Sequence, residues 1–263
     1  MPVIEKLPEF SSRFGRWYGD EKLAGYPFIE NINTPFTPLR RALPMLNLAL
    51  ITSAGAYIDG TNPFVTDSKD GDATIKEIPI EVEASDLRYA AKGYDPAAVQ
   101  QDRNAQIPVD RLLEYQANAV IGKLNETWWS ISSHIPNARL VAEETAPKLA
   151  ERLIRYKVQA ALLIPASRLC HQTLGIIARG LEEKGIPTIM ISVDPQAVDR
   201  VRPPRTAYYT GDFGSVAGKP DWPEFQLRVL DETLRTMETF DQPGARKLGV
   251  VMESKVEAAR GER

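Results

Sequence analysis

The chain has 263 residues, of which 43% are hydrophobic and 25% are charged, so it is neither wholly disordered nor fibrous. A net charge of −3 excludes a global basic field that could hold a nucleic-acid backbone. The single cysteine excludes an internal disulfide, and with only two histidines the chain has no zinc-finger spacing and no HExxH motif. The sequence therefore predicts no recognisable metal motif, and it leaves a site made of carboxylates open.

The amino terminus has no basic segment followed by an apolar one, so we expect no signal peptide. The longest apolar runs are too short to span a bilayer. We therefore expect a cytoplasmic protein that binds neither membranes nor nucleic acid.

The first half of the chain predicts an aromatic arm followed by strands. Residues 1–44 are rich in aromatic and proline side chains, and the simplest interpretation is an N-terminal arm that packs its rings on the body. Residues 46–53 form a continuous apolar run, which is typical of a strand buried on both faces in a parallel sheet. Turn-forming residues fill 59–72, and residues 75–82 predict a strand that Pro79 interrupts.

The segment from 84 to 107 is polar and weakly patterned, and long segments of this kind are often functional. A helix is predicted over 108–119, with Pro108 near its first position and Gly122 as its C-cap. The adjacent Trp128 and Trp129 would face opposite sides of a strand, so at most one of them could line a pocket.

The centre of the chain shows the clearest pattern. A helix over 140–156 precedes a buried strand over 158–165, a helix over 171–184 that ends at Gly185, and a strand over 186–193. This strand–helix–strand unit implies a right-handed parallel crossover. A long helix over 222–240 would take Asp221 as its N-cap, and the charged tail from Glu253 is predicted to fray.

The predicted fold class is therefore α/β, a three-layer doubly wound and mainly parallel sheet with an aromatic N-terminal arm. We expect a single domain with an arm at 1–44, a core at 45–195 and a helical C-terminal extension at 196–263.

The loop between the strand ending near 165 and the next helix is the main candidate site, because ligands of open parallel sheets bind beyond the carboxyl ends of strands. A thiol at a helix start has its thiolate favoured, which indicates Cys170 as a nucleophile. Arg168 and His171 could add to that effect, and Ser167 could participate. The alternative is that Cys170 is a small buried side chain, His171 a surface or capping residue and Ser167 only the N-cap.

Four further residues are candidates for binding substrate. Ser53 and Gly55 end the first buried strand, where small residues would let backbone N–H groups approach a carboxylate. Asp102 and Asn104 lie in the weakly patterned segment, where a structural role is equally consistent with the sequence. Arg168 is the candidate cation. No GxGxxG or P-loop is present, so we expect no cofactor bound through a recognisable motif.

Several stretches together resemble a known family. They are LALITSAGAYI at 48–58 with GDATIKEIP at 71–79, residues 94–113 with IPVDRLL, residues 120–147 ending in EETAP, and AALLIPASRLCHQT at 160–173 with residues 185–188. In order and spacing they resemble the selenoprotein B family of glycine, sarcosine, betaine and D-proline reductases, in particular its short cysteine-containing members. The resemblance covers about residues 45–195.

The resemblance implies reductive cleavage at an activated carbon. In that chemistry a selenolate or thiolate attacks the carbon next to a carboxylate and displaces an amine, a second thiol releases the adduct, and partner subunits contribute a pyruvoyl group. Here Ser167 takes the first position of the C-x-x-C spacing, and the chain has no second thiol. The histidine common before Asp102 is also absent, because the matching region contains Lys92 and Tyr94 instead.

The resulting hypothesis is a thiol-dependent reductase acting on a small substrate, with Cys170 as nucleophile and an external thiol or a partner protein resolving the adduct. A pyruvoyl group would come only through a partner. Two alternatives stay open: a racemase- or lyase-like enzyme that uses Cys170 for proton transfer, and a non-catalytic subunit of a reductase complex. The expected partners are the substrate, a reductase-complex subunit or thiol donor, and further copies of the chain in a homo-oligomer.

Overall fold

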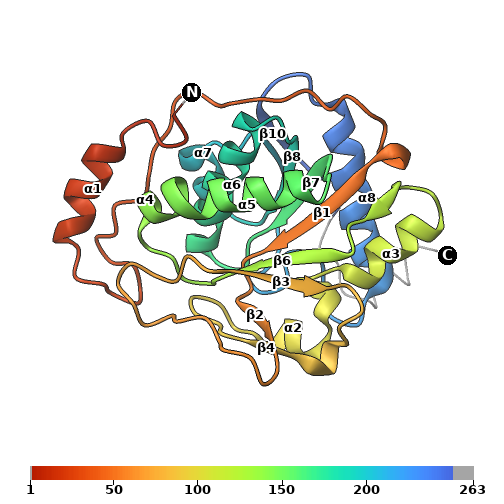
Figure 1. Cartoon of the computed structure of the whole chain (residues 1–263), viewed down its shortest axis with the longest axis horizontal. Coiled ribbons are helices and arrows are strands. Elements are labelled where there is room, and N and C mark those ends of the chain that lie inside the picture. The colour runs from red at the N-terminus through yellow and green to blue at the C-terminus, as the bar shows by residue number, and fades with distance from the viewer. Residues whose placement is uncertain (1, 251–263) are drawn as a thin grey trace.

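The core of the fold is a single, mostly parallel sheet (Figure 1). Within residues 2–250, which the computed structural model describes, this sheet contains β1 (Asn47–Thr52), β3 (Ile75–Pro79), β5 (Lys123–Leu124), β6 (Thr127–Ile131), β7 (Ala160–Ile164), β8 (Thr188–Ser192), β9 (Arg205–Tyr208) and β10 (Gly244–Lys247). The order is β10-β9-β8-β7-β1-β6-β3, and the short β5 pairs with the start of β1. Every pair is parallel except β3 with β6. The predicted α/β class with a mainly parallel sheet is therefore confirmed.

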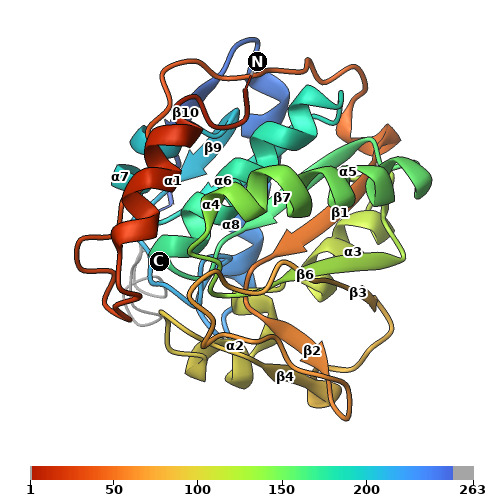
Figure 2. The same ribbon diagram turned by 60° about the vertical axis from the view of Figure 1, so that its left-hand side comes forward.

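A small antiparallel ribbon lies outside this sheet. It pairs β2 (Ala56–Ile58) with β4 (Leu87–Tyr89). Figure 2 shows the ribbon below β3, the edge strand of the sheet, with α2 beside it. β2 follows directly from the carboxyl end of β1, so the ribbon is joined to the sheet at the end where we expect the site.

Helices cover both faces of the sheet and give three layers (Figures 1 and 2). The α-helices of residues 2–250 are α1 (Leu7–Arg16), α2 (Ala97–Gln101), α3 (Val109–Ala117), α4 (Ala138–Leu140), α5 (Ala146–Arg155), α6 (Arg168–Glu183), α7 (Pro195–Val201) and α8 (Pro223–Thr239). Helices α3 and α8 pack on one face of the sheet, and α5 and α6 pack on the other. Successive side chains of a strand point to opposite faces. In β1, Leu48 and Leu50 accordingly join a core with α3 and α8, and Ala49 and Ile51 join a core with α5 and α6.

Local sequence signals explain the central helices. Ser167 caps α6 by accepting a hydrogen bond from the Cys170 backbone N–H, which satisfies one of the free donors of the first turn. Asp194 caps α7 in the same way, and Pro195 follows at the first position. The predicted β7–α6–β8 crossover is confirmed. Lys184 is the C-cap of α6, and Gly185 follows it with a φ of 82°, the left-handed conformation that glycine commonly adopts just after a helix.

The N-terminal arm packs its aromatic rings against the α5–α6 face. Phe10, Phe14, Trp17 and Tyr26 are buried and contact one another through stacked and edge-to-face pairs. Arg179 on α6 donates hydrogen bonds to backbone carbonyls of the arm. The aromatic arm is therefore part of the hydrophobic core, as predicted.

Two predicted caps are wrong. Helix α3 ends at Ala117, and Gly122 instead faces the start of β1, where a Cβ would lie 2.7 Å from the Leu46 carbonyl oxygen. Trp222, not Asp221, is the N-cap of α8. The Asp221 carboxylate accepts a hydrogen bond from Gln101, so it joins α2 to the start of α8.

The C-terminal region is less helical than predicted. Besides α8 and most of α7, residues 196–250 contribute β9 and β10, which extend the sheet at one edge. Trp128 and Trp129 are both buried, one in each core, because they alternate across β6. The predicted fraying tail from Glu253 lies outside the described residues. No helix within residues 2–250 has the length and apolar character to span a membrane.

Candidate functional site

The site lies between the carboxyl ends of β1 and β7, which are parallel neighbours in the centre of the sheet. The chain leaving β1 continues to β3 and β6 on one side of β1, whereas the chain leaving β7 continues through α6 to β8 on the other side. The two loops therefore diverge, and such a topological switch point is where open α/β sheets bind ligands. Ser53 follows β1 here, and Ser167 follows β7.

Cys170 lies at this switch point and is 1% exposed. Its Sγ atom is 3.4 Å from the Ser53 carbonyl oxygen and 3.3 Å from the Ser133 carbonyl oxygen. Ser133 follows β6, so the strand ends of β1, β6 and β7 all meet at this sulfur. The thiol is the donor in these contacts, because a carbonyl oxygen can only accept.

This environment favours the protonated thiol. Burial raises the pKa of Cys170 above its ordinary value, and hydrogen bonds involving Ser167 and Ser53 oppose that rise without reversing it. The helix start was expected to favour the thiolate, but desolvation is the larger effect. Cys170 therefore carries its proton at neutral pH in this arrangement.

Neither neighbouring cationic candidate supports a thiolate here. His171 is buried, and burial lowers its pKa to about 4, so the imidazole is neutral. Its Nδ1 lies 2.7 Å from the Ser167 carbonyl oxygen and its Nε2 lies 3.3 Å from the Val193 backbone nitrogen, which assigns the proton to Nδ1. The half-exposed guanidinium of Arg168 is paired with the buried Asp194 carboxylate at 2.9 Å. Both side chains thus contact groups other than the thiol.

The backbone N–H groups after β1 are already bonded within the protein. Ser53 N donates to the Ile164 carbonyl at 3.4 Å, and Gly55 N donates to the Ile131 carbonyl at 3.1 Å. The expected arrangement, in which these groups face an anionic substrate, is therefore not formed here. Gly55 instead permits a close approach: its φ is 65°, and a Cβ would lie 2.6 Å from the Ala90 carbonyl oxygen.

Residues 90–95, called the strap below, cross the carboxyl edge of the sheet above the thiol. Ser133 Oγ donates to the Ala90 carbonyl at 2.6 Å and accepts from the Lys92 backbone N–H at 2.9 Å. The Tyr94 hydroxyl donates to the Ala54 carbonyl at 2.6 Å. Sequence reasoning missed both Ser133 and Tyr94, although the polar run that ends β6 was a signal for the first.

Asp102 and Asn104 form a second hydrogen-bond network. The Asp102 carboxylate accepts from Gln226 Nε2 at 2.6 Å and from the Asn104 backbone N–H at 2.9 Å. Burial opposes ionisation, yet the hydrogen bonds from Gln226, Asn104 and Asp221 lower the pKa of Asp102. Asn104 Nδ2 donates to Asp110 on α3 at 2.7 Å. The structure thus joins Ser53, Ser167 and Cys170 at one point and ties Asp102 and Asn104 to α3 and α8.

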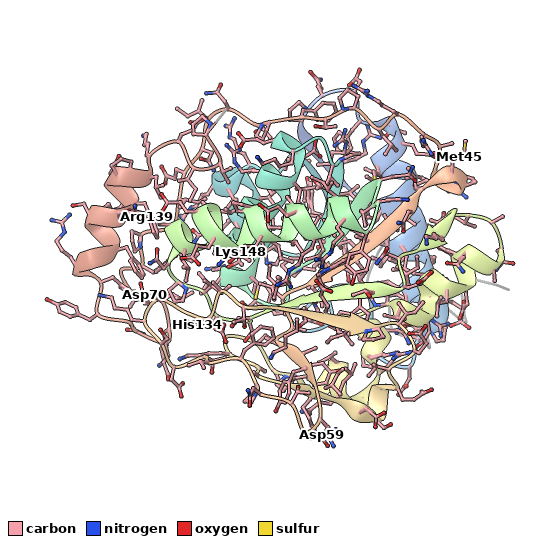
Figure 3. All side chains as sticks on the ribbon, in the orientation of Figure 1. Met45, Asp59, Asp70, His134, Arg139 and Lys148 are labelled. Carbon is pink, nitrogen blue, oxygen red and sulfur yellow. The ribbon has the colours of Figure 1, made fainter. Side chains whose placement is uncertain are left out.

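His134 lies directly after Ser133, at the end of β6 (Figure 3). It is buried, and burial and the nearby Lys92 lower its pKa to about 4, so it is neutral at physiological pH. Among residues 2–250, no group of three His, Cys, Asp or Glu side chains is placed to hold a metal ion.

Comparisons with known proteins agree on one family. The family model described as glycine/sarcosine/betaine reductase selenoprotein B matches residues 22–166, more than half of the chain, and ends just before Ser167. The chain is 28% identical to D-proline reductase subunit gamma of Acetoanaerobium sticklandii, over 80% of this chain and 85% of that protein. It is 27% identical to glycine reductase complex component B subunit gamma of Symbiobacterium thermophilum, over 66% of this chain and 41% of that protein.

The corresponding subunit of Peptoclostridium litorale is 24% identical, over 83% of this chain and 53% of that protein. The chain therefore spans about half or less of these two glycine reductase subunits, and most of the D-proline reductase subunit. No solved structure matches.

Proposed function

The chain belongs to the glycine/sarcosine/betaine reductase selenoprotein B family, and from this premise we propose that it is a subunit of a thiol-dependent reductase in which Cys170 is the nucleophile. The supporting observation is the place of the sulfur. Cys170 Sγ lies at the switch point between β1 and β7, in contact with groups from three strand ends. This is where the fold would present a reactive group to a small substrate.

The proposed reaction has three steps. The Cys170 thiolate attacks an activated carbon, a C–S bond forms, the bond to the leaving amine breaks, and the amine takes a proton. An external thiolate then attacks Sγ, the C–S bond breaks, and the released carbon takes a proton while a mixed disulfide forms. A second external thiol reduces that disulfide and restores Cys170. In total, two thiols are oxidised to one disulfide and one carbon–nitrogen bond is reduced.

The external thiol is required because the chain has one cysteine. The curated relatives are named as subunits of reductases or reductase complexes, which supports a partner subunit for this chain as well. Any pyruvoyl group would be carried by that partner. This chain's part is to supply the nucleophile and a binding site, for which Arg168 is the candidate contact to a substrate carboxylate, and Asp102 and Asn104 are further candidates.

The thiol must lose its cover and its proton before it reacts. Burial is the main cause of the raised pKa of Cys170, so exposure to water would return that pKa toward its ordinary value. The partner subunit is a candidate to stabilise the arrangement in which the thiol is exposed.

A specific observation favours a second function. A buried thiol with a raised pKa, and a neutral His171 with both ring nitrogens bonded, are also what a non-catalytic subunit would show. In that case the chain would bind a partner or a substrate while another subunit carries the redox chemistry.

The two functions can be separated by substitution of Cys170. The protein, purified with its partner subunits, would be assayed for dithiothreitol-dependent reduction of D-proline and of glycine. We expect Cys170→Ser and Cys170→Ala to lose turnover by more than about 100-fold, the scale of removing a covalent nucleophile. The control is Ser12→Ala, an exposed position on α1, which should keep full activity.

Mass spectrometry provides the second readout. Trapping without added thiol should show a covalent adduct on Cys170 of the wild-type protein. Full turnover by Cys170→Ala would refute the nucleophile and support the non-catalytic subunit. Deuterium exchange from solvent into substrate without thiol consumption would support proton transfer instead.

A further inference from the structure

The strap lies next to a fully buried polar site. Ser53, Ser167 and Cys170 are 0%, 2% and 1% exposed. The strap residues above them are partly or fully exposed, and none belongs to a helix or strand. An irregular segment therefore packs over the start of α6, next to the thiol.

Side-chain hydrogen bonds hold much of the strap in place. Ser133 Oγ bonds to the backbone at both Ala90 and Lys92, and the Tyr94 hydroxyl bonds to the Ala54 carbonyl. Segments that lack a regular backbone ladder open locally at lower free energy than the core. The Tyr94 bond is the one that joins the far end of the strap to the chain leaving β1.

The fit of the strap is close. Gly93 has a φ of 84°, and a Cβ there would lie 3.5 Å from Ser167 Oγ, directly over the cap of α6. The Tyr94 ring lies against Gly214, where a Cβ would be 2.7 Å from the ring. Gly214 N donates to the Ala166 carbonyl at 2.9 Å, so the segment around Gly214 supports Tyr94 from the other side.

The strap is connected at both ends to elements outside the main sheet. It continues from β4, whose partner β2 belongs to the small ribbon outside the main sheet, and it is followed by the short helix α2 (Figure 2). Displacement of the strap would therefore leave the pairing of the central strands unchanged. The left-handed backbone at Gly93 is a position that can absorb a change in φ and ψ.

From this geometry we propose that the strap is a lid over Cys170 and that the hydrogen bond from the Tyr94 hydroxyl to the Ala54 carbonyl is its latch. Reagents reach the thiol only from the minor open arrangement, so their rate is the product of the open fraction and the intrinsic reactivity of the thiol. The inference concerns regulation of the proposed site and rests on the proposed function for its biological meaning. The accessibility of the Cys170 thiol that it predicts can be measured without assaying turnover.

The test is the rate of Cys170 alkylation by iodoacetamide at pH 8, followed by intact mass. Tyr94→Phe keeps the ring and removes the hydroxyl, so we expect alkylation to become faster by about tenfold, the effect of one buried hydrogen bond on an opening equilibrium. Tyr115→Phe is the matched control, because its hydroxyl also donates to a backbone carbonyl, that of Leu227, at 2.7 Å between α3 and α8. This control should stay within about twofold of the wild type.

Thermal unfolding would be measured for each variant to compare global stability. Equal alkylation rates for wild type and Tyr94→Phe would overturn the lid, and so would equal acceleration by both variants, since that result indicates global unfolding. If Tyr94→Phe does not fold, the wild-type rate is measured in low urea. If a lid opens locally, the alkylation rate should depend only weakly on urea concentration. If the thiol is reached only by global unfolding, the logarithm of the rate should rise with urea in proportion to the full m-value.

The alkylation test of the lid and the turnover test of the proposed function have independent outcomes. A lid with no catalytic role gives fast alkylation of Tyr94→Phe and full turnover by Cys170→Ala. A catalytic thiol without a lid gives the opposite pair of results.

Discussion

The buried neutral histidines should make the stability of this protein depend on pH in a defined window. His134 and His171 each have a pKa of about 4 in the folded chain, lowered mainly by burial from an ordinary value of 6.5. The unfolded chain therefore binds more protons between these two values. The contribution of these two histidines to the free energy of unfolding is complete above pH 6.5 and is lost as the pH falls toward 4.

The size of the effect follows from the two pKa values. As the pH falls from 7 to 5, each histidine becomes protonated in the unfolded chain but stays neutral in the folded one. Each then removes about 2 kcal/mol from the free energy of unfolding, and the two together about 4 kcal/mol. For His171 the physical reason is that protonation at Nε2 would place a charge in the core and remove the acceptor of the Val193 N–H.

Several carboxylates titrate below this window. Hydrogen bonds lower the pKa of Asp72, Asp102 and Asp110 despite their burial, so these carboxylates lose stabilising interactions at lower pH. The informative quantity is therefore the difference between wild type and a histidine variant at the same two pH values.

The assay is urea unfolding at pH 7 and pH 5 for wild type, His171→Gln and His134→Gln. Between pH 7 and pH 5, the free energy of unfolding of each variant should fall by about 2 kcal/mol less than that of the wild type, whatever its value at pH 7. A variant that loses as much as the wild type would show that its histidine is protonated in the folded chain. For His171, that result would refute the assignment of a neutral ring bonded at both nitrogens.

Two further predictions concern the framework around the site. Glu182→Gln leaves the fully buried Arg205 guanidinium without its anion, so it should lower the free energy of unfolding, measured by urea titration, by about 3 kcal/mol. The exposed control Glu151→Gln should change that free energy by less than about 0.5 kcal/mol. A loss under 1 kcal/mol for Glu182→Gln would contradict this. Gly55→Ala should cost about 1–3 kcal/mol, because its φ is 65° and the new Cβ would meet the Ala90 carbonyl; a thermal midpoint equal to that of the wild type would show that the strap yields without strain.

Much of the fold followed from local patterns. Apolar runs predicted β1, β7 and β8, and their lack of alternation indicated strands buried on both faces, because side chains on each face need an apolar neighbour. The cap at Ser167 and the glycine after α6 were readable because caps satisfy backbone groups within one helical turn. The ribbon of β2 and β4 was not predicted, because three-residue strands carry too short a pattern.

Cys170 shows the same difference between what local sequence determines and what tertiary structure determines. The sequence alone determined that a cysteine follows a buried strand at the start of a helix, since the strand, the cap and the helix are local features. Only the tertiary structure decided the state of its thiol. Ser53 and Ser133 are 117 and 37 residues away along the chain, and strand order brings their carbonyl groups to the sulfur. Burial at this junction excludes water, and desolvation outweighs the effect of the helix start, so the thiol is protonated.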